Sequence, residues 1–255
     1  MFKTGLVSVT FRKLSPREII NLVKQANLTA IEWGGDIHVP HGNIKQAEEV
    51  SKMTIDAGLE VASYGSYYKP LAEGSPEFSA VLDTACALQA KTIRIWAGNK
   101  GSHEADERYW DKIIEDTIIN AEQAKQVGIS LAFEYHGNTL TDTVESALKL
   151  IQAINLPNVS LYWQPAVNLP VEKRCADLQQ VISYLSNLHV FEWDGWTPLP
   201  LEHGSENWRK YFSVIPYDEK VHYTMLEFVI KDSPEQFLQD AKILKMLVNE
   251  YNFKK

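Results

Sequence analysis

Two glutamates lie in apolar segments where an unpaired carboxylate would be costly to bury. Glu227 stands within Met225–Val229, and Glu134 follows another apolar run. A carboxylate among buried residues must be paired, ligate a metal or become neutral. We favour metal binding or catalysis for both glutamates. A buried ion pair, with Arg94 as the partner, is the structural alternative.

A histidine in a third apolar segment could complete a metal site. For His189, a metal ligand and a satisfied core histidine are equally good interpretations of the residues alone. Two glutamates, one histidine and an amide oxygen suit Mn²⁺, Mg²⁺ or Co²⁺ better than a structural Zn²⁺ site. We expect one bound divalent ion, which is Mn²⁺, Mg²⁺, Co²⁺ or Zn²⁺. No two of these residues share a short spacing, so the fold must bring them together.

Further polar and aromatic side chains near them are candidates for substrate binding. His136 lies two residues after Glu134, on the same side of a strand, and either binds substrate or supports that carboxylate. For Glu32 and Arg94, a supporting pair or a substrate-binding pair is as good an interpretation as direct catalysis. His38 falls in a following loop, where plain surface exposure is the simpler interpretation. Aromatic residues near strand ends suggest a carbohydrate-sized pocket: Tyr64, Tyr67, Tyr68, Trp96, Trp163, Trp193 and Trp196.

The elements that must position these residues alternate between strand-like and helix-like segments. Strands that alternate with helices pair in parallel, and eight such units in 255 residues predict a single (β/α)8 TIM barrel, an α/β fold spanning residues 1–255. A doubly wound open sheet is the second choice, but its glycine-rich first turn is missing. The expected strands are Gly5–Thr10, Ala30–Trp33, Glu60–Ser66, Thr92–Ala97, Ile129–Tyr135, Val159–Gln164, Leu188–Trp193 and Tyr223–Ile230.

Local signals mark where several helices begin and end. Ser15, Ser75 and Ser233 each precede a Pro and a nearby Glu, the pattern of a capped helix start. Gly58 and Gly128 suit the residue just beyond a helix end. The stretch from Asp194 to Pro216 is predicted to be a long irregular loop, and such loops are often functional.

Composition narrows the class of protein. The formal net charge of −8 argues against a nucleic-acid or anionic-membrane surface. Neither a signal peptide nor a run of about 18 apolar residues is evident, so we expect a soluble cytoplasmic protein. Two cysteines cannot make a disulfide framework. Oligomeric state stays open, although a homo-oligomer such as a dimer or tetramer would be ordinary.

Several segments resemble the xylose isomerase-like barrel superfamily, in particular its sugar phosphate isomerase/epimerase branch. The resemblance spans nearly the whole chain and is carried by the segments Ile31–Gly34, Ile93–Gly98, Glu134–Gly137, Leu188–Phe191, Leu201–Trp208 and Leu226–Glu227.

The resemblance implies one divalent metal held by residues from the last four strands. Carried over by position, the ligands are Glu134, Gln164, His189 and Glu227. The family usually has an aspartate where this chain has Gln164. A neutral amide removes one negative charge, so we expect weaker metal binding.

The implied activity is sugar isomerisation or epimerisation of a ketose or keto acid by proton transfer beside a carbonyl, through an enediolate. Glu134 and Glu227 would be the catalytic residues, and the predicted substrate-binding residues are His136, Arg94, Glu32, His38, Trp96 and Tyr64. A metal-dependent dehydratase shares the first step and stays open. So does a sugar-binding barrel without catalysis. A DNA-repair endonuclease on this barrel is disfavoured by the charge and the sparse set of ligands.

Overall fold

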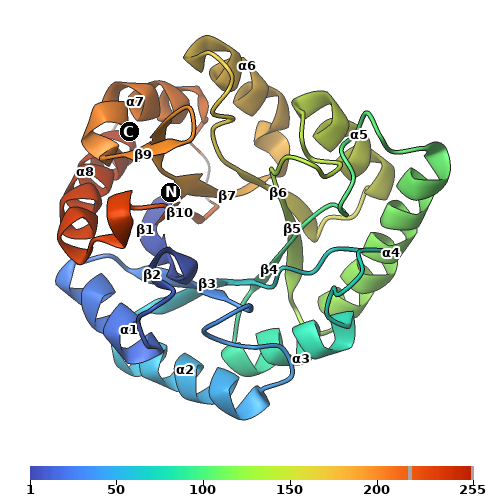
Figure 1. The fold of residues 1–255 in the computed structure, drawn as a ribbon, viewed down its shortest axis with the longest axis horizontal. Helices are drawn as coiled ribbons and strands as arrows, with labels where there is room; N and C mark the ends of the chain where they lie inside the picture. The colour runs from blue at the N-terminus through green and yellow to red at the C-terminus, as the bar shows by residue number, and fades with distance from the viewer. Residues whose placement is uncertain (218–219, 254–255) are drawn as a thin grey trace.

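The computed structural model describes residues 1–217 and 220–253, which form a closed barrel of parallel strands surrounded by helices (Figure 1). Around the barrel the strands run in the order β1-β10-β7-β6-β5-β4-β3-β2. The (β/α)8 prediction is confirmed, because an open doubly wound sheet would not close on itself. The barrel strands are β1 (Phe2–Val7), β2 (Ala30–Gly34), β3 (Glu60–Gly65), β4 (Thr92–Ile95), β5 (Ser130–Glu134), β6 (Val159–Trp163), β7 (Leu185–Val190) and β10 (His222–Leu226).

An outer layer of helices covers the barrel, and one α-helix follows each barrel strand. Apolar side chains of the helices and the strands pack together in a continuous core between the two layers. Within the described residues, none of the helices is both long enough and apolar enough to cross a membrane. The helices are α1 (Pro16–Gln25), α2 (Ile44–Asp56), α3 (Phe78–Leu88), α4 (Glu107–Gln126), α5 (Val144–Ile154), α6 (Val171–Val181), α7 (Ser205–Val214) and α8 (Pro234–Asn252).

Most of the predicted helix boundaries are confirmed. Ser15 forms a complete capping box at the start of α1, and the Ser233 hydroxyl caps α8. Gly58 and Gly128 follow α2 and α4 with φ of 77° and 73°, a conformation that favours glycine. The Ser75 prediction is wrong: α3 begins later, and the Ser75 hydroxyl instead accepts a hydrogen bond from the backbone of the preceding loop.

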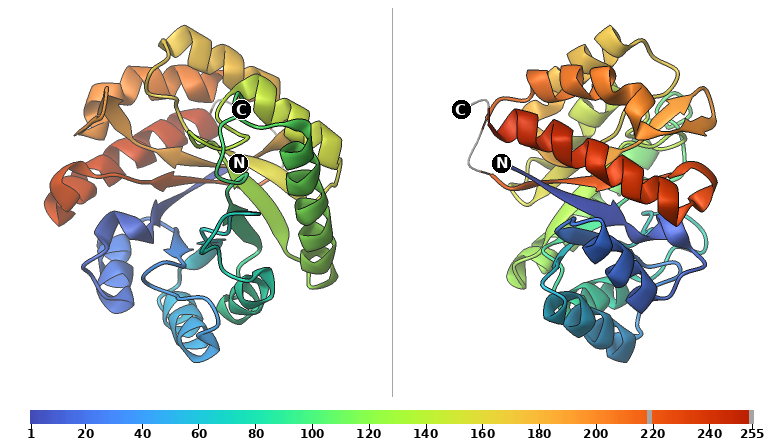
Figure 2. Two further views of the ribbon diagram at one scale, coloured as in Figure 1. Left: turned by 45° about the vertical axis from the view of Figure 1, so that its right-hand side comes forward. Right: turned by 90° about the vertical axis from the view of Figure 1, so that its left-hand side faces the viewer.

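The segment from residue 194 to residue 216 is not an irregular loop. It contains the second strand of a short antiparallel hairpin, β8 (Glu192–Asp194) with β9 (Thr197–Leu199), and all of α7. The hairpin and the N-terminus lie at opposite ends of the barrel (Figure 2). Trp208 of α7 is fully buried and donates its indole N–H to the Phe191 carbonyl at 3.0 Å. The helix is therefore held against the end of β7 by a contact that lies far from the helix in sequence.

Three strands, β1, β7 and β10, end three or four residues earlier than expected, and this changes where the candidate side chains lie. β7 ends at Val190 and β10 at Leu226, so Glu227 is the first residue beyond its strand. β1 likewise ends at Val7 and leads into a 3-10 turn, Ser8–Phe11. The carboxyl ends of the strands are where (β/α)8 enzymes carry their active sites. Glu227 therefore stands at the rim of that end.

Candidate active site

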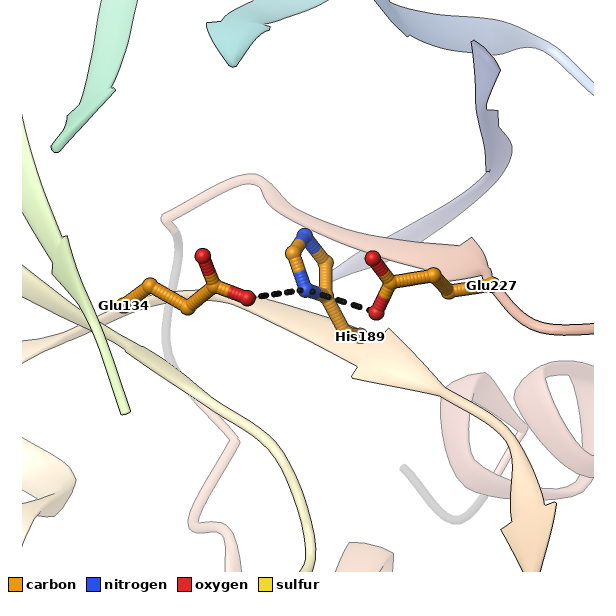
Figure 3. Close-up of side chains that lie close together, drawn as sticks. All are labelled: Glu134, His189 and Glu227. Carbon is orange, nitrogen blue, oxygen red and sulfur yellow. Dashed lines mark ion pairs between the residues drawn. The ribbon is translucent and has the colours of Figure 1, made fainter. Parts of the chain in front are cut away.

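Three of the four predicted metal ligands converge on Nδ1 of the fourth, His189. The Gln164 Oε1 and Glu227 Oε2 atoms each lie 3.2 Å from this nitrogen, and Glu134 Oε1 lies 3.6 Å away. The ligand atoms of the two glutamates and the histidine are all within 4.8 Å of one another. Figure 3 shows the imidazole between the two carboxylates. Glu134 and His189 lie in β5 and β7, while Gln164 and Glu227 directly follow β6 and β10, so no short sequence motif contains these residues.

A buried arginine joins this group to a third carboxylate. Arg94 of β4 is 2% exposed and Glu32 of β2 is fully buried. The Arg94 Nε donates to Glu32 Oε1 at 2.7 Å, and its Nη1 donates to Glu134 Oε2. Two of three buried carboxylates thus pair with one guanidinium, and the third, Glu227, lies against His189. When His189 is neutral, as a metal ligand must be, two negative charges remain, which is the charge that a divalent cation balances.

The protonation states follow from the same arrangement. Burial alone would raise the pKa of Glu134, but the Arg94 guanidinium and His189 lower it to about 2. Burial alone would lower the pKa of His189, yet the facing Glu227 and Glu32 carboxylates raise it well above its ordinary value. Glu134 therefore stays ionised. The carboxylates of Glu227 and Glu32 favour a positive charge at the position of His189.

The donor atoms fit a divalent metal ion. Among the described residues, Glu227 Oε2 is buried without a hydrogen-bond partner, although buried polar atoms are normally bonded. The Gln164 amide donates to the Tyr135 carbonyl at 2.6 Å, so its oxygen faces His189. Two carboxylates, an imidazole and an amide oxygen form a ligand set for Mn²⁺, Mg²⁺, Co²⁺ or Zn²⁺.

Glu32 lies behind the histidine rather than in front of it. Its Oε1 is 3.5 Å from His189 Nε2, and its Oε2 accepts a hydrogen bond from the Ser63 hydroxyl at 2.6 Å. A side chain at Gly65 would place its Cβ 2.7 Å from Arg94 Nη2, so glycine is needed for this close approach. A histidine that gives Nδ1 to a metal carries its hydrogen on Nε2, which here points to a carboxylate.

A cavity of about 610 Å³ opens above these residues, and several predicted residues line it. The His136 ring stacks on Trp96 with the ring centroids 3.9 Å apart, and its Nδ1 donates to the Gly137 carbonyl at 2.7 Å. This bond leaves His136 Nε2 available in the cavity. The Trp96 indole N–H donates to Glu134. Residues of the wall include Arg94, Trp96, Glu134, His136, Gln164 and Glu227.

Three predicted substrate-binding residues are not on the described cavity wall. Glu32 accepts hydrogen bonds from Arg94 and from Ser63. His38 bonds with the Ser8 hydroxyl at 3.0 Å and with the Leu14 carbonyl at 3.2 Å. The Tyr64 hydroxyl donates to the Val39 carbonyl at 2.8 Å. Their geometry supports a role in holding the site together rather than direct contact with a substrate.

Sequence reasoning missed several residues of the wall. Thr10 and Arg12 come from the turn after β1, and Asp142 from the segment after β5, while Phe191 and Phe228 follow β7 and β10. In the sequence, the turn after β1 served only to disfavour a doubly wound sheet, because it lacks a glycine-rich pattern. Its position after the first strand was the available signal, because every such turn in a (β/α)8 barrel borders the active-site end.

Comparison with known proteins identifies the family. Residues 20–242 match the family described as xylose isomerase-like TIM barrel. The chain belongs to this family. The barrel is 24% identical to 3-dehydroshikimate dehydratase of Bacillus anthracis over 220 residues, which are 74% of this chain and 75% of that protein.

Solved structures share the architecture of this xylose isomerase-like barrel. The probable 3-DHS dehydratase involved in petrobactin synthesis from Bacillus anthracis superposes with a TM-score of 0.81, at 18% identity, covering 96% of this chain and 99% of that one. D-psicose 3-epimerase from Clostridium cellulolyticum gives 0.74 at 14% identity, with 97% and 98% covered. A barrel protein from Mycobacterium smegmatis in complex with magnesium gives 0.71 at 16% identity, with 97% of each chain covered.

Replacing Gln164 by glutamate should strengthen metal binding. Glu has the same length and adds a negative charge beside the ion, although it loses the bond to the Tyr135 carbonyl. We expect Mn²⁺ affinity to rise by about tenfold in calorimetric titration. Gln179→Glu on the exposed face of α6 makes the same change in net charge and should leave the affinity unaltered. Equal affinities of the two variants would contradict a ligand role for Gln164.

Replacing Glu32 by glutamine should weaken metal binding without removing a ligand. The neutral amide no longer stabilises the hydrogen on His189 Nε2, and partners of this kind affect metal affinity by about 10- to 100-fold. The matched control is Glu60→Gln, which breaks the ion pair with Lys3 where β3 begins. Calorimetry with Mn²⁺ should show weaker binding for Glu32→Gln alone; wild-type affinity in that variant would count against the proposed support of His189.

Proposed function

We propose that this chain is a metal-dependent dehydratase that removes water from a hydroxylated keto acid such as 3-dehydroshikimate. The convergence of Glu134, Gln164, His189 and Glu227 on one buried point, beneath a cavity of substrate size, carries the proposal. Such a site suits proton abstraction beside a carbonyl, which is the first step of this elimination. The match to 3-dehydroshikimate dehydratase supports the lyase over the isomerase.

The two glutamates differ in how free their oxygens are. Glu134 Oε2 accepts hydrogen bonds from Arg94 and from Trp96, whereas no hydrogen bond to either Glu227 carboxylate oxygen is found among the described residues, so that Oε1 stays free when Oε2 faces the metal ion. A general base needs a lone pair that can reach the substrate proton. We therefore assign proton removal to Glu227, and to Glu134 the role of a fixed negative ligand. A bound divalent cation would polarise the substrate carbonyl and balance the negative charge that develops on its oxygen.

The departing hydroxyl group also needs a proton. His136 lines the cavity, and its ring is fixed by the stack on Trp96 and by the bond from Nδ1 to the Gly137 carbonyl. In its imidazolium form the ring would pass a proton from Nε2 to the leaving oxygen, so that water departs as a neutral molecule and the imidazole is left neutral. Proton removal by Glu227 and proton delivery by His136 together account for the elimination of water.

An epimerase is the second candidate, and the structural similarity to D-psicose 3-epimerase favours it. That reaction shares the proton abstraction but returns a proton to carbon instead of losing a hydroxyl group. A nuclease is disfavoured by the net charge and by the single cluster of metal-binding side chains found in the described part of the chain.

The choice between the two reactions can be tested on the purified, Mn²⁺-loaded protein. We expect 3-dehydroshikimate to lose water and yield an aromatic diol acid, detected by its ultraviolet absorbance. D-fructose, examined by chromatography, should remain unchanged. Conversion of the ketohexose without any water loss from the keto acid would reject the dehydratase and support the epimerase.

The role of Glu227 can be tested with an isosteric change. Glu227→Gln removes the proton acceptor and should lower kcat by about 10²- to 10⁴-fold at saturating Mn²⁺. Circular dichroism and thermal unfolding should show an intact fold, because the residue lies just beyond β10. Glu202→Gln, on an exposed turn, serves as the control with full activity. Turnover by Glu227→Gln at the wild-type rate would exclude Glu227 as the base.

A further inference from the structure

The cavity wall holds a cation that the proposed chemistry does not use. Arg94 also lines the cavity but is committed to Glu32 and Glu134. Arg12 lies in the turn after β1 and its side chain is 49% exposed. Lys69 is not part of this wall, and its ammonium lies 3.7 Å from the Trp96 ring centroid. Arg12 is thus the arginine of the described wall that can meet a ligand.

Arg12 is held in place from two sides. Its Nη1 donates to the Asp36 carboxylate, and its Nη2 donates to the Tyr67 hydroxyl at 3.2 Å. A guanidinium carries five N–H groups in a planar fork, so three remain for other acceptors. The Asp36 contact fixes the guanidinium at the rim without using up its donors. A ligand would then meet an arginine that is already oriented.

Two hydroxyl groups border the same part of the cavity. Thr10 is 6% exposed, lines the cavity, and its Oγ1 has no hydrogen-bond partner among the described residues. Tyr67 also lines the cavity and accepts from Arg12, while no bond donated by its own hydroxyl is found in the part of the chain that the structure describes. Together with Arg12 they offer guanidinium and hydroxyl donors, and the Asp36 carboxylate that pairs with Arg12 is not among the described residues of the cavity wall.

Tyr67 also connects this corner of the cavity to the buried charges. Its ring lies 5.3 Å from the Arg94 guanidinium carbon, while its hydroxyl bonds to Arg12. The backbone of Tyr67 is left-handed, with φ of 57°, which is strained for a bulky residue. This conformation places the ring between the two arginines. Strain of this kind at a cavity wall is commonly maintained for function.

We infer that Thr10, Arg12 and Tyr67 form a subsite for the carboxylate of the substrate. Arginine matches a carboxylate with two parallel N–H···O bonds, and the hydroxyl groups supply further donors. The subsite would select keto acids over neutral sugars. This inference rests on the proposed function and deepens it. It states that the dehydratase would bind the substrate carboxylate at a place away from the reacting carbons.

Binding, rather than turnover, provides the test. The Mn²⁺-loaded protein is titrated calorimetrically with 3,4-dihydroxybenzoate and with its amide, which has the same diol but no charge. We expect the acid to bind at least about tenfold more tightly than the amide. Arg12→Gln and Thr10→Val should remove most of this preference while leaving Mn²⁺ affinity unchanged. Arg17→Gln, on the exposed face of α1, is the control that keeps the preference.

Each other outcome has a definite meaning. Failure of the acid to bind, equal binding of acid and amide, or an undiminished preference in Arg12→Gln would overturn the subsite. Inorganic phosphate is included as a competitor, and strong competition that depends on Arg12 would reassign the subsite to phosphate and reject the carboxylate. A protein that prefers the acid but eliminates no water from 3-dehydroshikimate would refute the dehydratase and leave the subsite standing.

Discussion

The imbalance of charge inside the barrel is the constraint on which the rest of the site depends. Three carboxylates are buried beside a single buried guanidinium, which pairs with only two of them, and isolated buried charges are strongly unfavourable. Neutral hydrogen-bond donors stabilise two of these carboxylates, since Ser63 donates to Glu32 and Trp96 donates to Glu134. Small residues of the barrel interior, Ala30, Ala62 and Ala132, leave room for these large polar side chains. The remaining negative charge is what makes a divalent cation the fitting occupant.

The fold, and the convergence of site residues that lie far apart in the sequence, were predictable because both follow from the alternation of strands and helices along the chain. Alternating strands and helices imply a parallel barrel, and in such a barrel all strands end at the same rim. Glu134, His189 and Glu227 could therefore be expected together although no motif links them. A pairing of Glu32 with Arg94 was one of the alternatives that the fold allows, since both come from even-numbered strands, which share layers of the interior, and the two side chains do form this pair.

The parts that could not be predicted depend on tertiary contacts. α7 lies in a stretch rich in prolines and glycine that resembles a loop, and it is held by the buried Trp208 against the end of β7. The positions of Arg12 and Tyr67 depend on a strained backbone and on bonds between separate turns, which no local pattern reports. At Ser75 the local pattern suggests a helix start that does not form there. The Ser75 hydroxyl instead accepts a hydrogen bond from the backbone of the preceding loop.

Dehydratase and epimerase differ only after the carbon acid has lost its proton, so the residues beyond the metal site must decide between them. An epimerase must return a proton to carbon from the opposite face, which requires a second free base. Here Glu134 is engaged by Arg94 and Trp96 and has a pKa of about 2, so it holds a proton poorly at neutral pH. His136 offers a ring nitrogen to the cavity instead. A site with one free carboxylate and one histidine is better matched to removing a proton from carbon and giving one to a departing oxygen.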